Sequence, residues 1–296
     1  MKVMKMPVVT MLCNPAKPIL EAATVAVVQR AWGGGEIRWL SEGVAAEFGI
    51  SQMPENRWGI WQQMQDIGVD LILQTDQGRK KRVLLADMDS TMIQQECIDE
   101  LAAEAGVGDH VASITARAMN GELDFEAALT ERVGLLKGLD SAVIETVLHE
   151  RITLMPGAGP LVATMRANGA YAALVSGGFT AFTRMIAGRL GFDENRANTL
   201  LAADGKLTGK VALPILGRDA KVEALNDIVA RLALSAAEVM AVGDGANDLG
   251  MLELAGAGVA LHAKPSVAAQ CDIRINHGDL TALLYIQGYG QAEFVE

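Results

Sequence analysis

The chain has 296 residues, half of them hydrophobic, so it can bury a sizeable core and is long enough for about two domains. Its net charge of −11 argues against a nucleic-acid partner, and no run reaches the roughly 20 apolar residues of a membrane-spanning helix. The three cysteines are far apart and odd in number, and the first seven residues lack the features of a signal peptide, so we expect a cytoplasmic protein without disulfides.

Residues 1–80 are predicted to form a small α+β domain. Strands are expected at 8–12, 36–40, 44–48 and 69–73, with helices at 18–31 and 56–67. This order resembles the ACT-type regulatory modules, which often bind amino acids at interfaces between two copies. The resemblance implies a possible homodimer through this domain. A module that binds no ligand and only dimerises or shields a sheet edge fits the pattern equally well.

A polar, basic stretch at 74–82 is interpreted as a linker to the strand Val83–Ala86. That strand is apolar without alternation, which is typical of a strand buried on both faces. Asp87 and Asp89 follow it on one side of the chain, where parallel sheets place their chemistry. Two carboxylates this close repel each other, so we expect a cation beside them. The alternative is a strand end followed by an ordinary helix cap.

Residues 93–154 have helical periodicity, with helices predicted over 96–105, 110–119, 124–136 and 141–150. Phe125 and Arg132 are seven residues apart and therefore share one helix face, two turns apart. Taken alone, Phe125 fits core packing, and Arg132 fits a surface ion pair with Glu126 or Glu131.

The remainder of the chain alternates strands and helices. Helices are expected at 160–167, 182–190, 220–232 and 249–254; strands at 172–175, 239–242, 258–261 and 272–275; and a hairpin at 198–202 and 206–211. This alternation predicts an α/β fold with three layers around a parallel sheet.

Three further polar groups belong to this alternating region. Ser176-Gly177-Gly178 ends an apolar run, and such a turn lets backbone N–H groups and a hydroxyl approach an anion. Lys221 falls in the first turn of a predicted helix, where a lone cation is unfavourable unless an anion binds nearby. A solvated lysine is the alternative. The third group is the acidic, glycine-rich loop 243–248, which again follows an apolar run.

Together, DMDST, SGG, the lysine and GDGAND resemble, in this order, the four signature motifs of the haloacid dehalogenase superfamily of phosphatases. The residues after the first motif, 89–100 and 125–136, are further similar to those of the bacterial phosphoserine phosphatases. The similarity covers about residues 82–276. Met88 departs from the pattern, because the family commonly has an aromatic residue there, but its side chain is expected to point away from the aspartates.

The resemblance implies a Rossmann-like catalytic core of residues 81–96 and 155–296, with a helical cap of residues 97–154 inserted in it. It also implies Mg²⁺-dependent hydrolysis of O-phosphoserine to serine and phosphate, the last step of serine biosynthesis. Asp87 would be the nucleophile that forms an aspartyl-phosphate, and Asp89 the general acid and base.

The other implied roles fall into three sets. Metal ligands would come from Asp87, Asp89 and Asp244, with Asp248 orienting the metal's waters. The phosphoryl group would be held by Ser176, Gly177 and Lys221, and Asn247 would contact either the phosphate or Lys221. The ammonium and the carboxylate of the substrate would bind Glu96 and Arg132.

Two rival functions stay open. One is a phosphatase or phosphotransferase of the same fold that acts on a different phosphomonoester, and Glu96 with Arg132 argues against it because such a pair fits a zwitterionic head group. The other is a non-enzymatic amino-acid sensor built on residues 1–80, which would not need the two aspartates after the first strand.

Overall fold

The computed structural model describes residues 6–296, so most of the stretch judged not to be a signal peptide lies outside it. The described residues form a four-stranded sheet, a six-stranded sheet and a two-stranded hairpin. None of the helices in 6–296 combines the length and the apolar character needed to cross a membrane.

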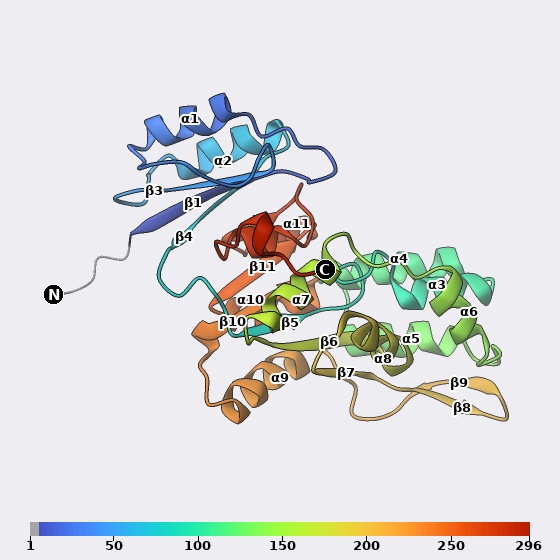
Figure 1. Cartoon of the computed structure of the whole chain (residues 1–296). Helices are drawn as coiled ribbons and strands as arrows, with labels where there is room; N and C mark the ends of the chain where they lie inside the picture. The colour runs from blue at the N-terminus through green and yellow to red at the C-terminus, as the bar shows by residue number, and fades with distance from the viewer. Residues whose placement is uncertain (1–5) are drawn as a thin grey trace.

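The first sheet belongs to an N-terminal α+β domain. Its antiparallel strands lie in the order β2-β3-β1-β4, and two helices cover its outer face (Figure 1). This confirms the predicted order of strands and helices. The first helix begins at Ala22 rather than at 18 because Glu21 is still extended. The elements are β1 Pro7–Leu12, α1 Ala22–Ala31, β2 Arg38–Ser41, β3 Ala45–Gly49, α2 Arg57–Asp66 and β4 Asp70–Thr75.

The inner face of this sheet packs against the rest of the chain. Leu12, Leu40 and Ile72 belong to the same buried cluster as Leu280 and Leu283. Burying these side chains removes apolar surface from water, which stabilises the contact.

Asp70 adds a polar contact between the N-terminal domain and the rest of the chain. It is fully buried, and its carboxylate accepts hydrogen bonds from the backbone N–H groups of Asn276 (3.0 Å), His277 (3.0 Å) and Gly278 (2.8 Å). A buried carboxylate is costly unless it is hydrogen-bonded, so these three bonds fix the domain in one position.

The six-stranded sheet is parallel, with the order β12-β11-β10-β5-β6-β7. Leu84 and Ala86 face one buried cluster, whereas Val83 and Leu85 face another on the opposite side of the sheet. This explains the apolar run without alternation and confirms the predicted three layers. The strands are β5 Val83–Ala86, β6 Tyr171–Phe179, β7 Glu194–Asn198, β10 Val239–Gly243, β11 Ala257–Leu261 and β12 Ile273–Ile275.

Strand β7 was not predicted. It is an edge strand of polar residues that pairs only with β6, so it lacks the apolar run of the central strands. The helices around the sheet are α7 Ala158–Ala167, α8 Thr180–Leu190, α9 Arg218–Arg231, α10 Leu249–Leu254, α11 Pro265–Ala268 and α12 Ala282–Tyr285.

Four helices interrupt the alternating pattern between β5 and α7, as predicted: α3 Cys97–Glu104, α4 Gly108–Met119, α5 Phe125–Leu135 and α6 Val143–Glu150. We call them the helical insertion. They gather on one side of the molecule, beside the hairpin of β8 Leu200–Ala203 and β9 Lys206–Val211 (Figure 1). Backbone hydrogen bonds from Gly138 N to Leu207 O and from Ser141 N to Gly205 O, both 2.9 Å, tie the hairpin to the insertion.

Candidate active site

The candidate site lies where strands β5, β6 and β10 end. Asp87 follows β5 directly, and its backbone N–H donates to Val242 O at 3.0 Å, so the two central strands hold it in place. Asp244 follows β10, and Ser176 lies in the last part of β6. The structure therefore brings the predicted motifs together at the carboxyl edge of the sheet, as parallel topology requires.

Lys221 lies at the centre of this edge and is fully buried. Its Nζ is 2.7 Å from Asp87 Oδ1 and 2.5 Å from Asp248 Oδ1. Asp248 Oδ2 accepts hydrogen bonds from the backbone N–H groups of Asp244 (3.1 Å) and Gly245 (3.0 Å). The alternative of a solvated lysine is therefore wrong.

The buried charges at this edge are unbalanced, because Lys221 pairs with both Asp87 and Asp248, while Asp244 has, among residues 6–296, only the half-exposed Lys264, whose Nζ is 3.9 Å from Asp244 Oδ2. Burial, reinforced by Asp248, raises the pKa of Asp87 well above its usual value, against the opposing effect of Lys221. Burial and the neighbouring carboxylates of Glu96, Asp248 and Asp87 also raise the pKa of Asp244. Burial would lower the pKa of Lys221, but Asp248 and Asp87 outweigh it and raise that pKa. The site is short of positive charge.

A divalent cation fits this site. Ligand atoms of Asp87, Asp244 and Asp248 all lie within 4.8 Å of one another. Asp244 Oδ2 is buried without a hydrogen-bond partner among residues 6–296, while Oδ1 of the same carboxylate accepts from Thr91 Oγ1 at 3.3 Å. A buried carboxylate oxygen with no donor is costly, and a metal ion would satisfy it.

The Ser-Gly-Gly motif forms a close-fitting wall. Ser176 is buried, and its Oγ accepts a hydrogen bond from the backbone N–H of Gly178 at 2.9 Å. A Cβ on Gly178 would lie 2.5 Å from Asp89 Oδ2, and one on Gly177 would lie 2.5 Å from the ring of Phe125. Only glycine permits these approaches. Asn247 faces the same space, and its Oδ1 is buried without a partner in the described part of the chain.

Arg132 lies on α5 and is only 2 % exposed, so the surface ion pair considered for it is wrong. Its Nε donates to Ala128 O at 3.1 Å and its Nη1 to Thr115 Oγ1 at 3.0 Å. The Thr115 hydroxyl in turn donates to Asp99 Oδ1 at 2.6 Å. The guanidinium is thus held by three helices of the insertion.

Glu96 immediately precedes α3, and its carboxylate accepts a hydrogen bond from Ser90 Oγ at 2.7 Å. Burial and the nearby Asp89 carboxylate raise its pKa to about 7. A carboxylate in these surroundings would be stabilised by a cationic group of a ligand.

One small cavity is lined by these parts. It is lined by Asp87, Asp89, Glu96, Arg132, Ser176, Gly177 and Asn247, together with apolar residues such as Met119 and Phe125. Lys221 and Asp244 are not part of this lining, and Met88 is buried in the hydrophobic core. The cavity holds only about 30 Å³, roughly the volume of one water. The free space between these side chains is therefore small.

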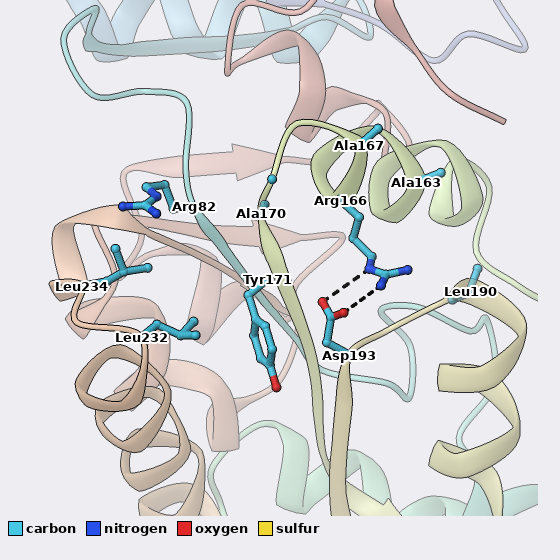
Figure 2. Close-up of a pocket in the computed structure, with 11 residues that line it drawn as sticks. Arg82, Ala163, Arg166, Ala167, Ala170, Tyr171, Leu190, Asp193, Leu232 and Leu234 are labelled. Carbon is cyan, nitrogen blue, oxygen red and sulfur yellow. Dashed lines mark hydrogen bonds and ion pairs between the residues drawn. The ribbon is translucent and has the colours of Figure 1, made fainter.

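A second hollow, of about 650 Å³, lies at the start of β6 and contains none of the predicted site residues (Figure 2). Its Arg166 and Asp193 pair with each other at 2.7 Å. This hollow is larger but lacks convergent reactive groups.

Sequence reasoning missed two residues that support Arg132, namely Asp99 and Thr115. They lie on different helices and follow no motif, so the sequence carries no local signal for their contact.

The comparisons with known proteins agree with this geometry. The model of the haloacid dehalogenase-like hydrolases matches residues 84–253, and the chain belongs to that family. Its six-stranded parallel sheet, inserted helices and N-terminal α+β domain represent the α/β fold predicted for it.

Within the family, the chain is similar to phosphoserine phosphatases. It is 41% identical to the one from Streptomyces coelicolor over 84% of this chain, although the match spans only 62% of that relative. It is 46% identical to the one from Streptococcus thermophilus, over 70% of this chain and 95% of the relative. Among solved structures, a HAD-family hydrolase from Salmonella enterica serovar Typhi superposes with a TM-score of 0.84 at 30% identity, over 96% of this chain and 99% of that one.

Proposed function

We propose that this protein hydrolyses O-phosphoserine to serine and phosphate, as the last step of serine biosynthesis. The observation that carries the proposal is one small cavity whose lining combines Asp87 and Asp89 with Glu96 and Arg132. In a bound substrate, the first pair would face the phosphate at one end and the second pair the head group at the other. A reactive carboxylate beside a pair of opposite charges matches a phosphate ester with a zwitterionic head. The similarity to phosphoserine phosphatases supports the same substrate.

The reaction has two steps. The Asp87 carboxylate attacks phosphorus, the bond to the serine oxygen breaks, and the phosphoryl group is transferred to Asp87 as an aspartyl-phosphate. Asp89 gives its proton to the departing serine oxygen. It then takes a proton from water as that water attacks the aspartyl-phosphate, which releases phosphate and restores both carboxyl groups.

The phosphoryl oxygens are held by groups of the core. The Ser176 hydroxyl, the Gly177 N–H, the Lys221 ammonium and the Asn247 amide would donate to them. Phosphoryl transfer depends mostly on such positioned donors and cations. Lys221 suits the role because it already lies 2.7 Å from the nucleophile.

Mg²⁺ is the cation we propose for the acidic cluster, held by the carboxylates of Asp87 and Asp244 and by the Asp89 backbone carbonyl. When bound, it would neutralise charge on the phosphoryl group. Asp248 would act indirectly by orienting the metal's waters, because both of its oxygens already accept hydrogen bonds from Lys221 and from the backbone.

At the other end, Glu96 would bind the substrate's ammonium and Arg132 its carboxylate. Arg suits this task because its planar fork can donate to both carboxylate oxygens. Thr115 and Ala128 occupy only Nη1 and Nε of the guanidinium, which leaves further N–H groups for a ligand.

The proposal divides the chain into three units: an ACT-like domain of residues 1–80, a catalytic core of residues 81–96 and 155–296, and a cap of residues 97–154. A homodimer through the first unit would use its helices or the β2 edge, because its inner sheet face packs on the core. A cytoplasmic location completes the proposal.

Phosphate release from three related esters, with Mg²⁺ present, tests this function. The substrates are O-phosphoserine, phosphoethanolamine, which lacks the carboxylate, and 3-phosphooxypropanoate, which lacks the ammonium. We expect phosphoserine to exceed each analogue in kcat/KM by at least about tenfold, because each lost charge–charge contact is worth more than about 1.4 kcal/mol. Equal values would favour the rival phosphatase with another substrate.

A further inference from the structure

Strand β6 bulges where it carries the Ser-Gly-Gly motif. Val175 pairs with Arg196 and Phe179 pairs with Asn198, so four steps along β6 correspond to two along β7. Bulges of this kind redirect side chains near active sites, but they also remove backbone groups from the hydrogen-bonding ladder of the sheet. The backbone of Ser176–Gly178 therefore needs other partners.

The side chain of Asn198, the last residue of β7, supplies a partner for the carbonyl of Gly177. It is only 2 % exposed, and its Nδ2 donates to Gly177 O at 2.9 Å and to Leu216 O at 3.1 Å. Its Oδ1 accepts from the backbone N–H of Leu216 at 2.7 Å. Two carbonyls and one N–H surround this amide, so only one orientation of its oxygen and nitrogen satisfies all three.

The bond to Gly177 acts on the catalytic hydroxyl. The peptide between Gly177 and Gly178 is held at both ends, since its oxygen accepts from Asn198 and its N–H donates to Ser176 Oγ at 2.9 Å. Because Ser176 Oγ accepts this bond, its own proton is free to be donated to an anion in the cavity.

The bonds to Leu216 act on a second group. Leu216 lies two residues before α9, the helix that carries Lys221, and Gly217 between them lies against Phe125. One buried amide therefore fastens the bulge with Ser176 to the segment that leads to Lys221. These are the two elements from which donors to the phosphoryl group are proposed to come.

We propose that Asn198 is a positioning residue for phosphoryl transfer, which sets the Ser176–Gly177 loop and the start of α9 at the spacing that a phosphoryl group requires. The inference rests on the proposed function. It requires Asn198 to affect every phosphomonoester alike, because it acts on the phosphoryl end of the cavity and contacts neither Glu96 nor Arg132.

The test compares Asn198→Asp, which keeps the shape but loses both donated bonds, and Asn198→Ser, which keeps one small donor, with Asn195→Ala. Asn195 lies on the same strand, and its Oδ1 accepts only from Thr183 Oγ1, at 3.0 Å. For Asn198→Asp we expect kcat to fall about ten- to a hundredfold on both phosphoserine and p-nitrophenyl phosphate. Asn198→Ser should fall less, and Asn195→Ala should stay within about twofold.

The role of Asn198 is tested by the kcat of these variants and by their affinity for phosphate. Wild-type kcat in a folded Asn198→Asp or Asn198→Ser variant would overturn the inference, as would a loss confined to phosphoserine. Affinity for inorganic phosphate, measured by calorimetry, gives a readout besides turnover and should fall in parallel with kcat. If the wild type does not prefer phosphoserine, the proposed substrate fails, whereas the effects of Asn198 on p-nitrophenyl phosphate and inorganic phosphate still test this inference.

Discussion

The two ends of the active-site cavity are built differently. At the phosphoryl end, Asp87, Lys221 and Asp248 form a buried chain of opposite charges, in which the aspartates follow strands β5 and β10 and the lysine lies on helix α9. At the recognition end, Arg132 lies on α5 of the helical insertion and Glu96 immediately before α3, and Arg132 is held by a neutral hydroxyl and a carbonyl. The first end is fixed by charges within the protein, whereas the second keeps its charges available for a ligand.

This difference separates two tasks of the site, reaction with the phosphate and recognition of the rest of the substrate. The phosphoryl end contains the groups that would react with any phosphate ester, and it lies at the ends of strands that are buried on both faces. In the proposed function, Arg132 of the helical insertion and Glu96 just before it would distinguish one ester from another. A substitution at the phosphoryl end should therefore lower turnover of all phosphate esters. A substitution at the recognition end should lower turnover only of esters with a zwitterionic head.

The largest loss of turnover is expected for Asp87→Asn, a substitution at the phosphoryl end. An amide is a poor nucleophile and a poorer metal ligand, so turnover should fall on the order of a thousandfold or more, about 4 kcal/mol, on phosphoserine and p-nitrophenyl phosphate alike. Thermal unfolding should show an intact fold, with exposed Asp109→Asn as the control. Substantial turnover in the purified variant would show that Asp87 is not the nucleophile.

Removal of the metal should also abolish turnover through the phosphoryl end. The three clustered carboxylates carry more negative charge than Lys221 neutralises, so excess chelator should abolish turnover on both substrates and added Mg²⁺ should restore it. Ca²⁺ should not restore it, because it favours a looser coordination with more ligands. Phosphate release in chelator, with and without each cation, measures this, and full activity in chelator would refute a metal requirement.

Arg132→Ala should distinguish the two ends of the cavity, because it removes a contact at the recognition end alone. The loss of a charge-assisted contact to a buried carboxylate costs roughly 2–5 kcal/mol, or tens- to thousands-fold in kcat/KM for phosphoserine. p-Nitrophenyl phosphate has no carboxylate and should change far less. Equal losses on both substrates would assign Arg132 to the structure of the insertion or to the chemistry itself.

The smallest expected effect is a pH dependence at Glu96. Its pKa of about 7 means that the carboxylate is charged above that pH and protonated below it. Between pH 8 and pH 6, KM for phosphoserine should therefore rise by up to about tenfold as the contact with the ammonium is lost. p-Nitrophenyl phosphate shares the ionisation of the phosphate group and is the control. Glu96→Gln should remove the difference between the two profiles, and a difference that persists in this variant would exclude Glu96 as its source.

Most of the fold could be predicted from the sequence, because periodicity and turn chemistry are local. The strand before Asp87 and the four inserted helices lie within a few residues of their predicted positions. Strand β7 could not be predicted, because its pairing with β6 is set by tertiary contact rather than by its own polar residues. The Ser-Gly-Gly motif also lies within a bulged β6, not in a turn after it.

The candidate site was predictable where residues belong to a motif and not where they support one. Asp87, Ser176 and Asp244 follow apolar runs, and the sheet topology brings them together. For Arg132 the sequence alone favoured a surface position, because its partner Thr115 lies 17 residues away on another helix. Asn198 was expected to open a hairpin, and its bonds reach 18 and 21 residues along the chain.

The carboxylate of Asp70 connects strand β4 to a loop more than 200 residues later in the chain. Unfolding the first 80 residues separately would leave three backbone N–H groups of that loop without their acceptor and would expose the apolar side chains beneath them. The N-terminal domain and the catalytic core should therefore melt in one cooperative transition in calorimetry. For the same reason, a protease that cuts the connection between them should leave the two fragments bound to each other.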